Sequence, residues 1–296
     1  MHHLDMRKNI LTILLFVLGL SSTQAQLLWK ISGKGLKHPS YLFGTYHLIP
    51  IQFLDSVPGL YKAFNECDVV IGEIATNNID ATSKIEFAAS MPNHTKMTDL
   101  LKGDRYQSTD NELKSVLKLG LKDLSMMNPS LILSLYKIEL YKKATGLTDD
   151  TQSDSYFQLV ASEKDKKVIG LESISQQIKI LYGNGSLERQ ADILFEATKH
   201  KDITLNNMIK SNKLYKSGKI NDLVELSKGT GGLNDLTEDE YRKLIDDRNT
   251  EWMTKLPKYI TQSNCFIAVE ATHLGGTNGL IKQLEKAGYK VKSVEQ

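Results

Sequence analysis

The chain has 296 residues, of which 41% are hydrophobic and 24% charged, with 37 Lys and Arg against 35 Asp and Glu. This composition excludes a disordered chain and a collagen-like fibre, and it predicts a folded globular protein. The net charge of +2 argues against a nucleic-acid binder, which needs a basic excess on one face.

Residues 1–25 have the pattern of an export signal. Arg7 and Lys8 give a positive start, an apolar run of 11 residues follows, and small residues lead up to Ala25. The run is shorter than the roughly 20 apolar residues that cross a bilayer. We therefore expect cleavage near Ala25 and an exported mature chain that does not span the membrane, periplasmic in a Gram-negative bacterium and otherwise secreted.

The mature chain, residues 26–296, is expected to form a single α/β domain with a central mixed β-sheet flanked by helices and a helix-rich middle segment. The pattern of apolar runs predicts strands at 28–32, 41–45, 68–72, 167–172, from 265 onward and at an edge around 291. Helical spacing runs from 79 to 143, including 129–141, and recurs at 154–161, 188–200, 204–226, 238–256 and 280–287. Strands separated by helices in this way indicate an α/β layer fold.

Two cysteines remain after the export signal, each at the start of a predicted buried strand. They are Cys67 and Cys265. If these strands lie parallel and adjacent, the two sulfurs come together at one end, while Glu73 and His273 meet at the other. An oxidising compartment would allow a disulfide, and two buried thiols are an equally good interpretation.

Polar residues end three of the predicted strands, where ligands bind in open α/β sheets. His47 follows Gly44-Thr45-Tyr46, Glu73 follows Gly72, and His273 leaves a strand into a glycine turn. Two imidazoles and a carboxylate suit a divalent metal ion with open positions, and they equally suit acid/base chemistry without a metal. The residue types alone leave both chemistries open.

The order and spacing of these motifs resemble the TraB/GumN family over nearly the whole mature chain. The motifs are the hairpin into Gly44-Thr45-Tyr46-His47, Ile71-Gly72-Glu73, Gly170-Leu171-Glu172 with Gln177, Arg248-Asn249 with Met253, Phe266 to Val269 leading to His273-Leu-Gly-Gly with Gly279-Leu280, and Gly288-Tyr289. That family is similar to the Tiki proteins, described as metal-dependent proteases, and more distantly to erythromycin esterases and to ChaN-like haem-iron-binding proteins.

The resemblance implies that His47, Glu73 and His273 form a metal or catalytic site. The metal would be Mn, Co, Zn or Fe, and Arg248 would be an active-site cation. A guanidinium suits a substrate carboxylate or an oxyanion, although Arg248 could also be a surface arginine that pairs with a neighbouring carboxylate. The chain departs from the family pattern at Glu270, where a glycine is normal.

Three further carboxylates are candidates for a supporting role around the site. Glu172 could orient a histidine or cap the helix that follows Ser173. Asp154, which follows Gln152 where the family has a glycine, has the position of a helix cap more than of a catalyst. Glu270 could add a ligand, raise the pKa of a neighbour or disable the family's chemistry.

The sequence and the resemblance together predict an exported, metal-dependent hydrolase, peptidase-like, with a His/Glu/His site. Metal-activated water would attack an amide or ester carbonyl of a peptide or small molecule, with Arg248 stabilising the oxyanion. One alternative is a metal-independent, esterase-like hydrolase with a histidine base. A second is a non-catalytic periplasmic iron- or haem-binding protein. The substrate and the oligomeric state are open.

Overall fold

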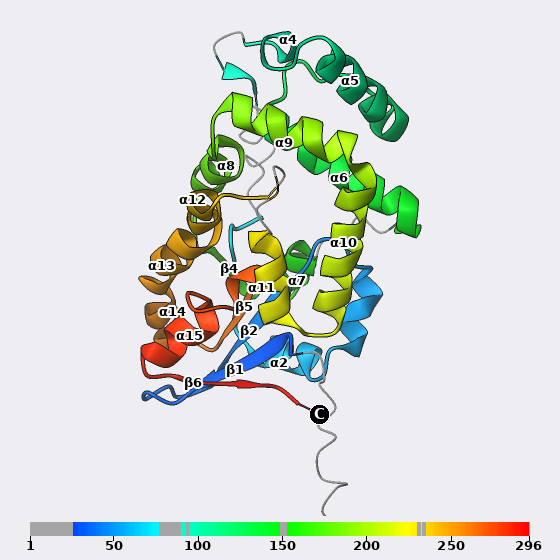
Figure 1. The fold of residues 1–296 in the computed structure, drawn as a ribbon. Coiled ribbons are helices and arrows are strands. Elements are labelled where there is room, and N and C mark those ends of the chain that lie inside the picture. The colour runs from blue at the N-terminus through cyan, green and yellow to red at the C-terminus, as the bar shows by residue number, and fades with distance from the viewer. Residues whose placement is uncertain are drawn as a thin grey trace, which may run out of the picture.

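The computed structural model describes residues 26–76, 90–92, 95–148, 153–229, 232 and 235–295. Within them the chain forms an α/β fold, a single body built around one six-stranded mixed sheet with a helix-rich middle segment (Figure 1). This confirms the fold class that the sequence predicts. The strands are β1 Leu28–Ser32, β2 Ser40–Thr45, β3 Val69–Gly72, β4 Lys167–Gly170, β5 Cys265–Glu270 and β6 Lys290–Ser293.

The sheet has the strand order β4-β3-β5-β2-β1-β6. Its first four strands are parallel to their neighbours, whereas β1 pairs antiparallel with both β2 and β6. In the register, Thr45 lies opposite Glu270, and Gly72 lies opposite Gly170. The carboxyl ends of β2, β3, β4 and β5 therefore meet at one edge, which is the edge where ligands bind in open α/β sheets.

Helices surround this sheet and fill the middle of the chain. Two of the predicted helices are broken. The stretch 204–226 divides at Gly218, whose φ of +64° is a backbone conformation that ends a right-handed helix. The stretch 238–256 contains a π-helical turn and ends at Met253, whose carbonyl a continuing helix would bond to the N–H that Pro257 lacks; Pro257 lies in the first turn of the next helix. The helices are η1 Ile51–Ser56, α2 Leu60–Glu66, α4 Met97–Leu100, α5 Asp104–Leu117, α6 Pro129–Thr145, α7 Ser153–Glu163, α8 Ile174–Gly183, α9 Leu187–Lys199, α10 Lys201–Lys216, α11 Ile220–Lys228, α12 Glu238–Tyr241, the π-helix η3 Arg242–Asp246, α13 Asp247–Met253, α14 Leu256–Gln262, η4 Ala271–His273 and α15 Leu280–Lys286.

Two hydrophobic clusters hold the layers together. Under the sheet, Phe157 of α7 packs against Phe43 of β2, Phe64 of α2 and Phe266 of β5, with ring centroids 4.8 to 5.6 Å apart. Aromatic groups of this size contribute much of a core's buried apolar area. A second cluster joins α4, α5, α6 and α9, which lie together at the top of Figure 1. The helix-rich segment thus has its own packing beside the sheet.

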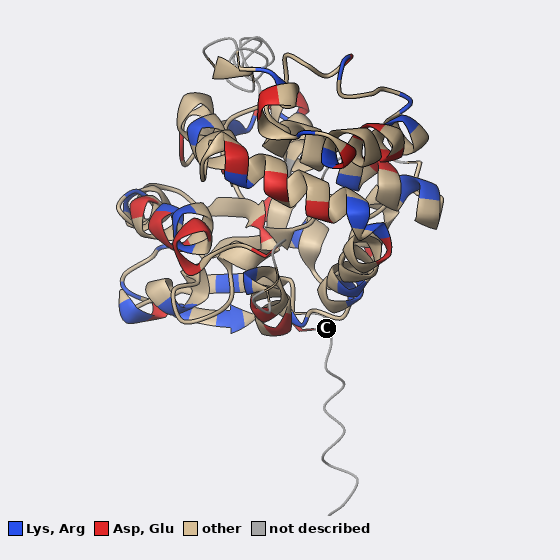
Figure 2. Cartoon of the chain, turned by 45° about the horizontal axis from the view of Figure 1, so that its top comes forward, with Lys and Arg blue, Asp and Glu red and all other residues tan. Residues whose placement is uncertain are grey.

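The surface carries charges of both signs. Lys and Arg residues alternate with Asp and Glu residues over the helices that Figure 2 shows. Across the described ranges, no helix combines the length and the apolarity needed to cross a membrane. The predicted export signal, residues 1–25, and Gln152 lie outside the described residues.

Candidate active site

Two glutamates lie side by side where β3 and β4 end. The backbone N–H of Glu172 donates to the carbonyl of Glu73 at 2.9 Å. Glycine suits residue 72, because a Cβ there would come within 2.4 Å of the Gln158 amide nitrogen and 3.0 Å of the Ile74 carbonyl oxygen. That amide, from α7, donates to the carbonyl of Ile74 at 3.0 Å. These contacts hold the turn after β3 in the conformation that directs Glu73 towards β5.

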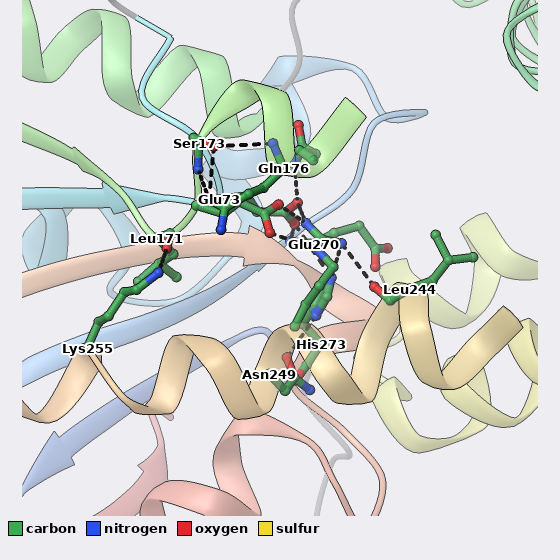
Figure 3. A network of polar contacts seen from close by, with 12 residues as sticks. Glu73, Leu171, Ser173, Gln176, Leu244, Asn249, Lys255, Glu270 and His273 are labelled. Carbon is green, nitrogen blue, oxygen red and sulfur yellow. Dashed lines mark hydrogen bonds and ion pairs between the residues drawn. The ribbon is translucent and has the colours of Figure 1, made fainter. Parts of the chain in front are cut away.

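Arg248 of α13 joins both glutamates in one buried cluster, with 5% of the residue exposed. Its Nη2 donates to Glu73 at 2.5 Å and to Glu172 at 2.7 Å, and its Nε donates to the second oxygen of Glu172 at 3.2 Å. Its Nη1 donates to the carbonyl of Leu244 at 3.1 Å and contacts Nε2 of His273 at 3.0 Å. A guanidinium has five N–H donors, so every one of them has a protein acceptor. Figure 3 shows the polar contacts around Glu73, Leu244 and His273.

The environment of His273 fixes its protonation. The Nδ2 amide of Asn249 donates to two backbone carbonyls, so its Oδ1 is the atom that accepts from Nδ1 of His273 at 2.8 Å. Nε2 is then the unprotonated nitrogen, which accepts from Arg248, because a guanidinium has no acceptor atom. Trp252 covers the ring at a centroid distance of 4.4 Å. His273 is therefore a neutral imidazole with both nitrogens occupied.

The pKa shifts agree with this assignment. Burial is the largest influence on His273 and lowers its pKa to about 3, although the charge of Glu73 acts in the opposite direction. Burial alone would raise the pKa of Glu73, but the charge of Arg248, with further help from His273 and a backbone N–H, lowers it to about 2. The cluster thus holds two glutamates around one guanidinium, and Glu73 is ionised at neutral pH.

Glu270, the residue that departs from the family pattern, acts as a helix cap. Its carboxylate accepts from the backbone N–H of Thr272 at 2.9 Å and from the Thr272 hydroxyl, at the start of η4. Its own N–H donates to Glu73 at 3.0 Å. Burial raises the pKa of Glu270, the charge of Glu73 adds to the rise, and His47 opposes it. A glycine at this position could not make the cap.

His47 lies on the same sheet edge, directly after β2, and its side chain is exposed. The preceding Tyr46 stacks on Tyr215 at 5.0 Å, and the Tyr215 hydroxyl donates to the carbonyl of Gly44 at 2.9 Å. These contacts hold the end of β2 in place. The described hydrogen bonds of the centre link Glu73, Glu172, Arg248 and His273, whereas His47 lies at its rim and acts electrostatically on Glu270. The side chain of Asp154 lies outside the described residues.

The donor set does not fit a metal ion shared by Glu73 and His273. The oxygens of Glu73 accept from Arg248, Gln177 and the N–H of Glu270. The lone pair of His273 Nε2 points at Arg248 as well, so a guanidinium lies where a shared metal ion would have to lie. In the described part of the chain, no group of three or more His, Cys, Asp or Glu side chains is arranged to hold a metal ion. The metal site stays a prediction.

The two cysteines are buried free thiols at the opposite end of the sheet. Burial is the largest cause that raises the pKa of each to about 12, and Cys265 adds to the shift at Cys67. The predicted parallel pairing of β3 and β5 is present, with Val69 opposite Cys265. The disulfide stays a prediction.

No role was predicted from the sequence for several groups that contact the centre. Gln177 and Asn249 belong to the resembling motifs, but nothing in their spacing shows that one binds Glu73 and the other His273. The carbonyl of Leu244 could not be found from residue type, because a backbone acceptor has no sequence signal. Glu172 binds Arg248, while Ser173 caps α8 through its own hydroxyl. Ser173 is thus the cap of α8, and Glu172 contacts Arg248 rather than a histidine, so its predicted role in orienting a histidine stays a prediction.

The fold and the centre define an α/β protein with a buried Glu–Arg–His cluster at the carboxyl edge of a mixed sheet. The chain belongs to the TraB/PrgY/gumN family, whose model matches residues 27–293. This confirms the resemblance that the motifs indicated. Comparisons with curated proteins and with solved structures found no match.

Proposed function

We propose that this chain is an exported hydrolase in which the His47 imidazole activates water against an ester or amide carbonyl, without a metal ion between Glu73 and His273. Membership of the family supports an enzyme of this kind only in general terms. The distant resemblance to erythromycin esterases implies a histidine base in particular. Among the alternatives from the sequence, the metal-independent one agrees best with the geometry.

The observation that carries this proposal is the saturation of Arg248. All five of its N–H groups bind Glu73, Glu172, His273 and the Leu244 carbonyl. Nε2 of His273 therefore has its lone pair on the guanidinium, and the oxygens of Glu73 accept from Arg248, Gln177 and the N–H of Glu270. For the same reason Arg248 has no donor left for an oxyanion, and its role is to position the two glutamates and the histidine.

His47 is the histidine suited to proton transfer. His273 is 1% exposed, and its pKa of about 3 makes it a weak base. His47 is exposed at the strand end and lies near enough to Glu270 to influence its pKa. In the proposed step, a His47 ring nitrogen takes a proton from water while the water oxygen bonds to the carbonyl carbon. The tetrahedral intermediate then expels the leaving group, which takes that proton from the His47 imidazolium and departs as the alcohol or amine.

A substitution of His47 with a matched control tests the proposal. His47→Gln is expected to lower kcat by roughly 10²- to 10⁴-fold in an ester and amide screen, the usual contribution of a general base. His38→Gln, at an exposed histidine before β2, should leave kcat unchanged. Elemental analysis should find no stoichiometric metal, and activity should survive a chelator.

Other outcomes contradict the proposal in different ways. Loss of activity with a chelator and its recovery with Mn, Co, Zn or Fe would establish the metal-dependent hydrolase. A coloured protein that binds iron or haem and turns over no ester or amide would establish the binding protein. Full activity of His47→Gln in a metal-free protein would assign the base to another residue.

A further inference from the structure

A cavity of about 660 Å³ opens between the helix-rich segment and the candidate active site. Its walls come from α6, α9 and α10 on one side, and from Tyr46 and Leu244 on the other. Leu244 is the residue whose carbonyl binds Arg248, so the cavity extends to the edge of the polar centre. Its volume lies in the range of about 300 to 1,000 Å³ that small-molecule sites have.

Much of the wall is aliphatic. Leu133, Leu181, Ile193, Ile203 and Met208 all line the cavity. Ile203 is 57% exposed and Leu181 is 40% exposed, which leaves a large part of their apolar surface uncovered by the protein. Covering such surface is favourable by about 25 cal/mol per Å². An apolar occupant would gain this free energy.

One lysine reaches this wall from α6. Lys137 lines the cavity and is half-buried. Within the described ranges, no hydrogen bond or ion pair is made by its ammonium group. Burial lowers the pKa of Lys137, and the charge of Asp235 offsets this only in part. A desolvated ammonium without a close counter-ion is unfavourable, so the site favours an anion.

The carboxylates around Lys137 already have partners of their own. Glu196 lies 3.4 Å from Nε2 of His200, and Glu240 forms an ion pair with Arg189 at 3.3 Å. Asp235 accepts a hydrogen bond from the N–H of Gly232 at 2.8 Å. These contacts leave Lys137 as the charged group of the lining that an entering anion can neutralise.

Two amide oxygens in the same lining are also unsatisfied. Asn184 and Gln190 each donate through their nitrogen to a backbone carbonyl. Their side-chain oxygens are buried and accept no hydrogen bond from the described residues. Buried acceptors of this kind normally have a partner, so an ordered water molecule has to supply the donor here, because an ionised carboxylate ligand has none.

We propose that this cavity binds a small carboxylate with an apolar body, whose carboxylate pairs with Lys137 and whose hydrocarbon part lies against Leu181 and Ile203. The inference does not rest on the proposed hydrolysis, because binding can be measured without turnover. A ligand that failed to bind would leave the His47 experiment untouched, and an inactive enzyme would leave the binding result untouched.

Calorimetric titration of the mature chain with octanoate, and with 1-octanol as its uncharged counterpart, tests the proposal. Octanoate is expected to bind saturably. Lys137→Met should weaken octanoate binding by about tenfold or more, as expected for a partly desolvated ion pair, and should leave 1-octanol binding unchanged. Ile203→Asp should weaken the binding of both ligands.

The control is Lys210→Met, which removes an exposed lysine of α10 that is not part of the cavity lining and should change neither affinity. Lys137→Gln provides a second uncharged variant if the methionine variant does not fold. Equal octanoate affinity in the wild-type chain and both Lys137 variants would overturn the proposal. Absence of saturable octanoate binding to the wild-type chain at millimolar concentration would also overturn it.

Discussion

Two cations in the described part of the chain, the buried Arg248 and the half-buried Lys137, are in opposite situations. Arg248 has all five N–H groups on protein acceptors, including two glutamates. Lys137 lines a cavity and forms no ion pair or hydrogen bond within the described ranges. Burial penalises both charges, but only Arg248 is compensated by carboxylates within hydrogen-bond distance.

The comparison shows how the protein uses a buried charge. A cation whose N–H groups are all hydrogen-bonded to the protein fixes the positions of its partners and has no donor left for a ligand. A cation without close partners adds little to the order of the fold, but it retains its capacity to bind an anion. Arg248 therefore organises the centre, whereas Lys137 is available for recognition.

Removing Arg248 gives the largest expected effect. Arg248→Met would leave Glu73 and Glu172 buried without their cation, and we expect the free energy of unfolding to fall by about 3 to 5 kcal/mol. Urea denaturation measures the change. Arg242→Met, which removes an exposed arginine paired with Asp239 and Asp247, is the matched control and should cost about 1 kcal/mol or less. Equal effects at the two sites would contradict a special role for the buried cluster.

Acid should destabilise the saturated centre in two stages. The pKa of His273 is about 3 in the folded protein, below its ordinary 6.5. The imidazole of the unfolded chain therefore binds a proton at a pH where that of the folded chain does not. As a result, the free energy of unfolding falls as the pH drops below about 6.5. Glu73, with a pKa of about 2 instead of 4.5, adds to the loss below about pH 4.5. We expect His273 to contribute a slope of about 1.4 kcal/mol per pH unit between these values.

Urea denaturation across the range from pH 7 to 4.5 would show this slope. His273→Gln should remove that contribution, because glutamine does not titrate. His38→Gln, at an exposed histidine, should leave the slope as it is. An unchanged slope in the His273 variant would show that this imidazole is not held neutral by the fold.

Removing Lys137 should have the smallest effect on stability, and of the opposite sign. Lys137→Met takes away a desolvated ammonium that no described residue pairs with, and it leaves the hydrocarbon part of the side chain in place. We expect the free energy of unfolding to stay the same or to rise by up to about 1 kcal/mol in the absence of ligand. A loss comparable to that of Arg248→Met would mean that the lysine supports the fold, and the contrast between the two cations would disappear.

The sequence predicted the sheet and much of the centre because strand ends have a clear signal. Gly72-Glu73 ends an apolar run, and the run from Cys265 leads to His273. Parallel pairing then brings the ends of such strands together. Which atoms bind one another could not be predicted, because the position of Arg248 depends on how α13 packs against the sheet.

Lys137 was not identified because its pattern resembles an ordinary amphipathic helix. It lies between Leu133 and Tyr141 at intervals of four residues, on a stripe that a 3.6-residue period turns towards the protein interior. A lysine at such an inward-facing position therefore indicates a charge that is turned into the protein. Long side chains often extend out to water from this position, so only the cavity shows that this ammonium stays inside.

The π-helix η3, Arg242–Asp246, determines how α13 is aligned with the helix that precedes it. The N–H of Asp247 bonds to the carbonyl of Arg242, five residues back, so this turn holds one residue more than an α-helical turn. Successive residues of an α-helix are rotated by about 100°. In an uninterrupted α-helix, one added residue would therefore turn α13 about its axis and point Arg248 and Asn249 away from His273, whereas the π-turn absorbs the extra residue and keeps both side chains on the His273 side. Two chains that differ by one residue at this turn can then share the same centre, and an alignment gap here would not mean that the site is lost.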